Sequence, residues 1–178
     1  MIRIVPLSKQ YLEQAIDVTQ ASFQNKREEN EMYLTCSLNP EMRKRILGRY
    51  GCDSLRYWAA VQEEQVIGMM GFYTLDIDKK DTIWGIGFCV DEKFRGRGIG
   101  SRLLDLAIET ARIENYTWFN IPTENSPLQA TAQRLYDQKK FQIYAIRDFF
   151  EGTIWFRTLN LKEEQIKKPE EKTILRIF

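Results

Sequence analysis

The fold is decided by the stretch Phe88-Cys89-Val90-Asp91-Glu92-Lys93-Phe94-Arg95-Gly96-Arg97-Gly98-Ile99-Gly100-Ser101. Before its glycines, residues 83–90 are rich in branched and aromatic side chains, which predicts a buried strand. After them, apolar side chains recur every four residues, as on one face of a helix: Ile99, Leu103, Ala107 and Ala111. The stretch therefore predicts a strand, a glycine-rich turn and a helix.

A turn of this kind is suited to bind a pyrophosphate. The first turn of a helix leaves N–H groups without partners in the helix, and the glycines Gly96, Gly98 and Gly100 let a phosphate approach them. Charged donors flank the glycines: Arg95, Arg97 and Arg102. The alternative is that the glycines only turn the chain from a strand into a helix.

The glycine spacing argues against two common phosphate motifs. A nucleoside triphosphate loop needs Lys and then Ser or Thr after its last glycine, but Gly100 is followed by Ser101 and Arg102. A dinucleotide fingerprint would place its third glycine at position 101, which is Ser101 here.

Two motifs resemble those of a known family, the GCN5-related N-acetyltransferases (GNAT). The family's acetyl-CoA loop reads Arg or Gln, two residues, Gly, one residue, and Gly or Ala, which matches Arg95, Gly98 and Gly100. Its second motif commonly ends in Ala, two residues, Leu-Tyr and then Gly-Phe, which matches Ala132, Leu135, Tyr136 and Phe141, with Lys140 in place of the Gly. The resemblance covers roughly residues 55–160.

The pattern along the chain predicts one mixed α/β domain over residues 1–160. Strands are expected at residues 2–5, 55–62, 66–75, 83–90, 117–121, 141–149 and 153–160, and helices after Ser8, Asn39, Gly98 and Pro127. Residues 25–38 are ambiguous. Together with the resemblance, these elements imply a central, twisted, mostly antiparallel sheet of about seven strands with helices on both faces. Residues 161–178 read as a charged tail, whose apolar end could pack on the core or form a homodimer contact.

The resemblance implies the residues that bind acetyl-CoA. Backbone groups of Phe88, Cys89 and Val90 would hold the pantetheine arm, and the Val90 N–H is the candidate donor to the thioester oxygen. The loop that would bind the pyrophosphate comprises Arg95, Gly96, Arg97, Gly98, Ile99, Gly100 and Ser101. The family often has an Asn seven residues before the motif Tyr. Gln129 holds that place here, and Asn125 is the alternative.

The resemblance also implies catalytic roles. Tyr136 matches the family's general acid, which protonates the leaving thiolate, although it could instead only pack in the core. Carboxylates that serve as the base in other members are missing, because Asn120 and Gly85 stand at the matching places. Glu124 is the candidate base, and a water relay or a merely solvated Glu124 are the alternatives.

Histidine is absent, which excludes Ser-His and Cys-His nucleophile pairs and imidazole-based zinc sites. We therefore expect no metal site. Cys89 could suggest a covalent route, but a thiol on an apolar strand without a base to activate it is more often part of the core. Direct acetyl transfer is favoured.

Composition limits the partners. The chain of 178 residues has 26 basic and 25 acidic side chains, so no excess charge attracts nucleic acid or an anionic membrane. The three cysteines are unevenly spaced, the N-terminus enters a strand pattern at once, and no apolar run could span a bilayer. We expect a cytoplasmic protein that acts on a small molecule or a peptide.

The expected function is transfer of an acetyl group from acetyl-CoA to a primary amine, of a small molecule or of a protein N-terminus or lysine. The resemblance implies that the amine enters between residues 23–50 and 144–155, where several aromatic side chains could form a wall: Tyr33, Tyr144, Phe149, Phe150 and Trp155. Glu28, Glu29 and Glu31 could attract a cation or simply be solvated. The alternative function is an acyl-CoA-binding regulatory module with little or no activity, since three motif positions depart from the family pattern.

Overall fold

The computed structural model describes residues 1–23, 27–78, 81–150 and 152–162, so most of the predicted tail lies outside the described residues. The strands are β1 (Ile2–Pro6), β2 (Cys52–Gln62), β3 (Gln65–Leu75), β4 (Thr82–Val90), β5 (Trp118–Glu124), β6 (Gln142–Phe149) and β7 (Gly152–Asn160). The α-helices are α1 (Leu12–Ser22), α2 (Arg27–Leu38), α3 (Pro40–Ile46), α4 (Ile99–Ile113) and α5 (Ala130–Gln138). None of these helices is both long and apolar enough to cross a membrane.

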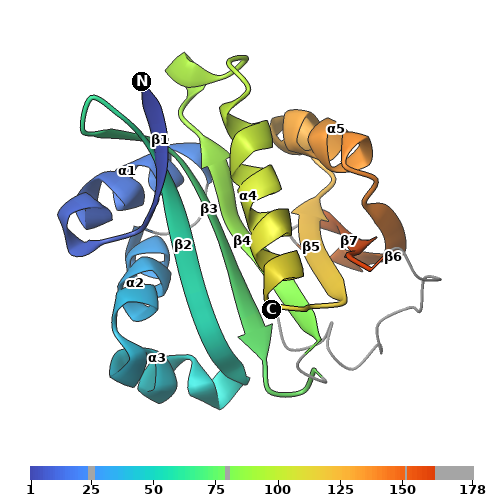
Figure 1. Ribbon diagram of the computed structural model, residues 1–178. Coiled ribbons are helices and arrows are strands. Elements are labelled where there is room, and N and C mark those ends of the chain that lie inside the picture. Colours follow the sequence, from blue (N-terminus) through green and yellow to red (C-terminus); the bar gives the residue numbers. More distant parts are fainter. Residues whose placement is uncertain (24–26, 79–80, 151, 163–178) are drawn as a thin grey trace.

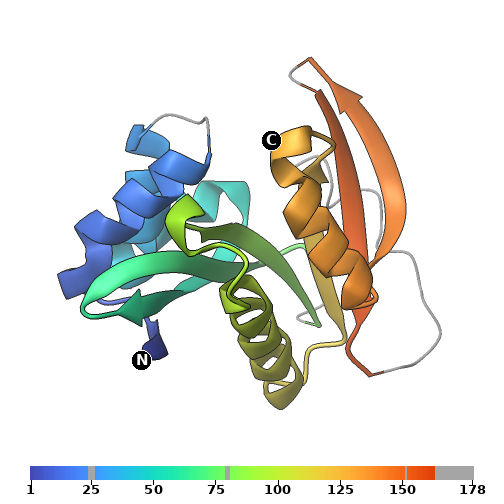
Figure 2. The ribbon, with the colours of Figure 1, turned by 90° about the horizontal axis from the view of Figure 1, so that it is seen from above.

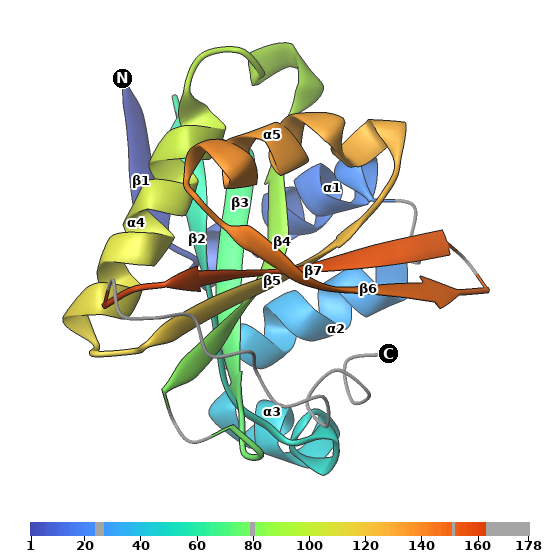
Figure 3. The ribbon, with the colours of Figure 1, turned by 90° about the vertical axis from the view of Figure 1, so that its right-hand side faces the viewer.

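The seven strands form one sheet in the order β1-β2-β3-β4-β5-β7-β6, and only β4 and β5 pair in parallel. The sheet twists so strongly that β5, β6 and β7 run across the direction of β1 to β3 (Figure 3). Helices α4 and α5 cover one face, while α1 and α2 cover the other (Figure 1). The predicted mixed sheet with helices on both faces is confirmed.

The two faces bury separate cores. The apolar stripe of α4, with Leu103, Leu104 and Ala107, packs with Phe119 of β5. On the opposite face, Ile16 of α1 belongs to a second core beneath α1, α2 and α3. The period of four in the sequence of α4 thus corresponds to its buried face, because side chains four residues apart lie one above the other on a helix.

The sheet opens between β4 and β5. Their parallel pairing is limited to the segment that ends at Trp84 and Asn120. Beyond it, the register of β4 with β3 shifts between Met69 and Gly71, and Gly87 adopts a positive φ of 62°. Such an irregularity bends a strand. The two strands therefore diverge toward the end of β4, as Figure 2 shows from above.

Most predicted element boundaries agree with the structure within a few residues. Asn39 caps α3 by accepting the N–H of Met42 at 3.0 Å, as the sequence predicts. The helix predicted after Ser8 begins later: residues Lys9–Tyr11 form a 3-10 turn, and the Ser8 side chain makes no capping bond. The ambiguous segment contains α2. The connection between the strands predicted at residues 66–75 and 83–90 lies partly outside the described residues.

Candidate active site

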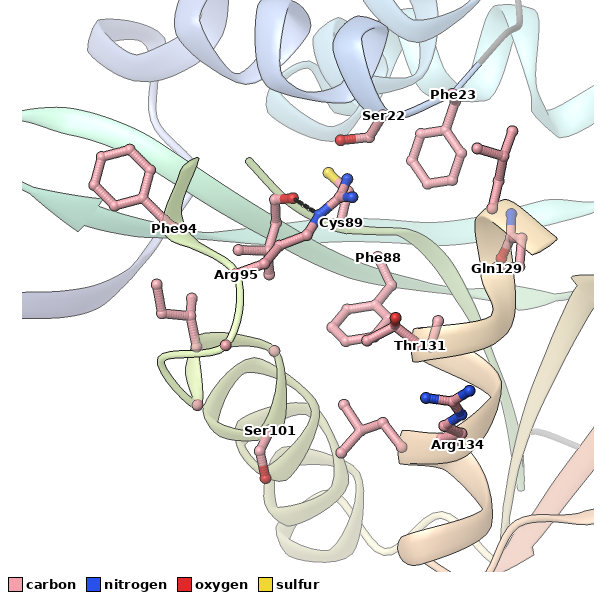
Figure 4. Close-up of a pocket in the computed structure, with 18 of the residues that line it drawn as sticks. Ser22, Phe23, Phe88, Cys89, Phe94, Arg95, Ser101, Gln129, Thr131 and Arg134 are labelled. Carbon is pink, nitrogen blue, oxygen red and sulfur yellow. Dashed lines mark hydrogen bonds between the residues drawn. The ribbon is translucent and has the colours of Figure 1, made fainter. Parts of the chain in front are cut away.

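A cavity of about 450 Å³ lies where β4 and β5 diverge, between the start of α4 and the face of α5. We call it the first cavity (Figure 4). Most of the predicted cofactor residues line it: Phe88, Cys89, Val90, Arg95, Gly96, Gly98, Ile99, Gly100, Ser101 and Gln129. Residues from three distant segments of sequence thus meet in one groove.

The start of α4 brings N–H groups that have no acceptor within the helix to this cavity. Gly98 is the N-cap of α4 with φ 74°, and the first helical bond runs from the N–H of Arg102 to its carbonyl at 3.1 Å. The N–H groups of Ile99, Gly100 and Ser101 therefore precede that bond. A Cβ at Gly98 would meet no atom within 4 Å, so its left-handed backbone, rather than lack of space, favours glycine here.

The main chain of Val90 points into the gap between β4 and β5. The N–H of Asp91 donates to the carbonyl of Ile67 on β3 at 3.0 Å, and Val90 lies opposite Gly68 in the same ladder. In antiparallel ladders, hydrogen-bonded pairs alternate with pairs whose N–H and C=O groups point away from the partner strand. Val90 belongs to the second kind, so its N–H faces the side on which pairing with β5 has ended.

The arginines differ in position. Arg95 Nε donates to the carbonyl of Val90 at 3.0 Å, and its guanidinium lies inside the first cavity (Figure 4). Arg97 lies outside it, where it stacks on Phe94 and donates to the Lys93 carbonyl. Arg134 of α5, which the sequence reasoning missed, also lines the cavity. Arg134 follows Thr131 by three residues and precedes Gln138 by four, so the three side chains lie on one face of α5, and all three line the cavity. This spacing is the feature of the sequence that could have indicated the position of Arg134.

The structure distinguishes between Gln129 and Asn125, the two amide side chains that are candidates for binding the cofactor. Gln129 lines the first cavity, whereas Asn125 does not and is exposed, its main-chain N–H bonded to the Thr153 carbonyl at 2.8 Å. Ser126, which the sequence reasoning also missed, lines the cavity, and its buried hydroxyl has no hydrogen-bond partner among the described residues. The Ser101 hydroxyl is directed along α4 to Asp105 at 3.3 Å.

Tyr136 lies behind the wall of the first cavity rather than on its surface. Its side chain is buried, with ring centres 5.8 Å from Phe88, which does line the cavity, and 5.7 Å from Phe141. Burial raises the pKa of the Tyr136 phenol above its usual value, and the nearby Arg157 opposes that rise. The hydroxyl therefore keeps its proton at neutral pH.

Glu124 occupies the junction of two cavities. The second cavity, of about 610 Å³, lies between α2, the segment after α3 and the middle strands. Glu124 and Phe23 line both cavities. The Glu124 side chain is exposed, while its carbonyl accepts a hydrogen bond from Gln133 Nε2 at 2.8 Å. An amine in the second cavity would thus meet this carboxylate on its way to the first.

Asn120 and Gly85, the two positions that the resemblance matches to a base, hold no carboxylate. Asn120 is fully buried opposite Thr158 of β7, and neither polar atom of its amide has a partner among the described residues. A Cβ added to Gly85 would lie 3.0 Å from Ile121, tighter than an ordinary contact. Of the described residues, no group of three or more Cys, Asp or Glu side chains is placed to hold a metal ion.

The predicted acceptor wall is only partly correct. Tyr33 and Glu29 of α2 line the second cavity, and Ile154 represents the closing hairpin. The other predicted residues do not line it: Glu28, Glu31, Tyr144, Phe149, Phe150 and Trp155. Phe150 stands fully exposed after the end of β6.

Cys89 is not poised as a nucleophile. Its side chain is buried, and burial raises the pKa of the thiol to about 12. At neutral pH a thiol with this pKa is almost entirely protonated, and only the thiolate attacks a thioester readily. The geometry favours the structural interpretation of Cys89 over the covalent one.

The buried thiol predicts a loss of stability at alkaline pH. In the unfolded chain Cys89 ionises near its ordinary pKa, about 8.5, whereas in the folded protein it stays protonated to about pH 12. Between these values only the unfolded state gains from ionisation, so this group lowers the free energy of unfolding by up to about 1.4 kcal/mol per pH unit. Urea denaturation from about pH 8 to about pH 10.5 measures the fall. Cys89→Ala should reduce the slope, and identical slopes in the two proteins would contradict the prediction.

Comparisons with known proteins identify the family. The sequence profile of the acetyltransferase (GNAT) family matches residues 14–141, which is more than half of the chain. No curated protein matches the sequence at a significant level.

Solved structures share the fold. A GNAT acetyltransferase from Staphylococcus aureus Mu50 is 19% identical with a TM-score of 0.69, over 91% of this chain and 100% of that chain. One from Elizabethkingia anophelis with acetyl-CoA bound is 23% identical with a TM-score of 0.65, over 89% and 97%. The ribosomal-protein-S18-alanine N-acetyltransferase from Escherichia coli is 15% identical with a TM-score of 0.67, over 96% and 100%. The chain therefore belongs to the GNAT family of acetyltransferases.

Proposed function

We propose that the protein transfers an acetyl group from acetyl-CoA directly to a primary amine. The observation that carries this proposal is the Val90 N–H, which points into the gap between β4 and β5 beside the glycine loop. A main-chain donor aimed into a groove can stabilise negative charge that develops on a thioester oxygen. Membership of the acetyltransferase family supports acetyl-CoA as the donor.

The residues of the first cavity fit acetyl-CoA. The three N–H groups at the start of α4 suit a pyrophosphate, since the end of a helix favours anions there. Arg95 and Arg134 line the same cavity and can neutralise phosphate charge. From this end the groove leads past Val90 to Glu124, where the second cavity begins. When bound, acetyl-CoA would supply the thioester carbonyl that the amine attacks.

Each remaining task has a candidate residue. Glu124 accepts a proton from the arriving ammonium, which frees the nitrogen lone pair for attack. The Val90 N–H donates to the carbonyl oxygen as its charge grows, while the C–N bond forms and the C–S bond breaks. Tyr136 is the candidate proton donor to the departing sulfur, and the Phe88 ring, whose centre lies 5.8 Å from that of Tyr136, would have to move aside for the hydroxyl to reach it. The products are an amide and free CoA thiol.

A second candidate function is a CoA-binding module without catalysis. It is motivated by the buried Asn120 and the crowded Gly85, which leave no carboxylate at the usual places for a base. Amine-dependent release of CoA thiol, followed with a thiol reagent over a panel of amines, separates the two functions. Acetyl-CoA binding without thiol release for any amine would favour the binding module.

Replacing the candidate base should act on turnover alone. Glu124→Gln keeps the shape of the side chain and removes its ability to accept a proton. We expect kcat to fall by about 10- to 100-fold while the Kd for acetyl-CoA changes little, because proton transfer by a positioned base contributes at least that much. Steady-state kinetics and calorimetry give the two quantities. An unchanged kcat would assign proton removal to water.

A further inference from the structure

The second cavity is walled mainly by apolar and aromatic side chains of α2 and of strands in the middle of the sheet. Met32 and Tyr33 face it from α2, Leu55 and Tyr57 from β2, and Ile154 from β7. Its volume, about 610 Å³, lies within the range of cavities that bind small molecules. Its contact with the first cavity at Glu124 fixes which end of a bound molecule reacts.

Tyr57 is held in place by two glycines. A Cβ at Gly71 would lie 2.4 Å from its ring, and a Cβ at Gly87 would lie 2.8 Å from it. Both distances are too short for real atoms, so the ring packs directly against the backbone of β3 and β4. Burial raises the pKa of Tyr57 far above its usual range, and it stays an uncharged wall at any physiological pH. The buried Tyr73 phenol behaves in the same way.

Charges are confined to the edges of the second cavity. Three of the residues that line it are charged, Glu29, Glu124 and Arg49, and all three are exposed. Arg49 is engaged already, since its Nε donates to the Ile46 carbonyl at 3.1 Å and its guanidinium lies 5.1 Å from the centre of the Tyr50 ring. The interior offers no charged partner from the described residues, whereas Glu124 offers one to a single ammonium at the junction.

We propose that the acceptor is a primary amine carried on an uncharged, apolar body such as an alkyl or arylalkyl chain. The inference rests on the proposed function and assigns its substrate class. The ammonium lies at Glu124, and the apolar body fills the space between Tyr33, Tyr57 and Ile154. A carboxylate on the body would find only Arg49, which is already engaged, and a second ammonium would find a carboxylate only at Glu29 on the exposed edge. Elsewhere in the cavity either charge would be desolvated without a charged partner from the described residues, which is costly.

A series of alkylamines tests this directly. From propylamine to hexylamine, kcat/KM should rise about three- to fourfold per added methylene, the factor expected for burial of each CH₂. Hexylamine and 1,5-diaminopentane have the same number of non-hydrogen atoms but differ by a terminal methyl or ammonium. We expect hexylamine to exceed the diamine in kcat/KM by about 100-fold. A flat series or a preference for the diamine would overturn the inference.

Two variants test whether the preference for apolar amines arises in the second cavity. Tyr33→Ala removes one half-buried wall of the second cavity and should lower kcat/KM for hexylamine about tenfold, with less effect on propylamine. Phe150→Ala removes an aromatic ring that is exposed and outside the cavity, and both values should stay unchanged. Equal loss for both amines in Tyr33→Ala would count against an apolar wall at that residue. The Kd for acetyl-CoA, measured on both variants, checks that each is folded.

Failure of the inference is distinguishable from failure of the proposed function. Thiol release with amines, but without preference for apolar ones, overturns the substrate class and leaves the activity in place. If no amine releases thiol, the activity fails, and calorimetric titration of the protein–CoA complex with hexylamine and 1,5-diaminopentane then decides. Tighter binding of hexylamine supports the apolar cavity, whereas equal or weaker binding overturns it.

Discussion

Gly98→Asp should abolish acetyl-CoA binding, while Gly98→Asn should bind it almost as well as the wild-type protein. Asp and Asn have nearly the same shape, and among residues with a Cβ both tolerate the left-handed backbone that Gly98 adopts at φ 74°. A Cβ meets no atom there, so neither replacement is excluded by space. Only Asp adds a negative charge beside the N–H groups that would bind the pyrophosphate. Facing charges of like sign cost several kcal/mol, so we expect at least about a 100-fold weaker affinity.

Calorimetric titration with acetyl-CoA measures both variants, and urea denaturation confirms that both fold. Raising the salt concentration should reduce the difference in acetyl-CoA affinity between Gly98→Asp and Gly98→Asn, because ions screen exposed charges. Equal loss in Gly98→Asn and Gly98→Asp would show that the backbone conformation, and not charge, limits binding. Wild-type affinity in Gly98→Asp would place the phosphates elsewhere and would leave Gly98 as a turn residue.

The parts of the fold that sequence predicts well are those specified by neighbours in the chain. The spacing of Ile99, Leu103 and Ala107 predicts the buried face of α4, and Asn39 before Pro40 predicts the start of α3. Ser8 misleads because a 3-10 turn intervenes before α1. The strands predicted at residues 55–62 and 66–75 place the turn between β2 and β3 around Glu63 and Glu64. Both residues have positive φ in the structure, although glutamate rarely adopts that conformation.

The candidate site was predicted only where one stretch of chain forms it. The glycine loop and the end of β4 are adjacent in sequence, so their meeting in the first cavity follows from a strand-turn-helix unit. The place of Glu124 between two cavities depends on the divergence of β4 from β5, which no local pattern encodes. The resemblance places the closing hairpin at the entry of the amine, which predicts that its aromatic residues line the acceptor wall. In the structure none of these aromatic side chains lines the second cavity, and Ile154 represents the hairpin there.

Tyr136→Phe should lower kcat by about 100-fold and leave the Kd for acetyl-CoA within about twofold of wild type. The substitution removes one oxygen and keeps the ring contacts with Phe88 and Phe141. Burial raises the pKa of Tyr136, so the phenol is protonated, and able to donate, at both neutral and mildly alkaline pH. The loss of turnover should therefore be the same from about pH 7 to about pH 9. Arg157, which opposes the rise in pKa, would favour the phenolate that donation leaves behind.

Tyr144→Phe is the matched control for this prediction. The Tyr144 hydroxyl is also buried, burial likewise raises its pKa, and it has no hydrogen-bond partner among the described residues. Tyr144 lines neither cavity, so loss of its hydroxyl should leave kcat within about twofold of wild type.

An unchanged kcat in Tyr136→Phe would make Tyr136 a core residue and assign protonation of the thiolate to water. Weaker acetyl-CoA binding with the same kcat would instead show that the hydroxyl supports the wall at Phe88. Only a fall in kcat confined to Tyr136→Phe fits a proton donor behind the first cavity.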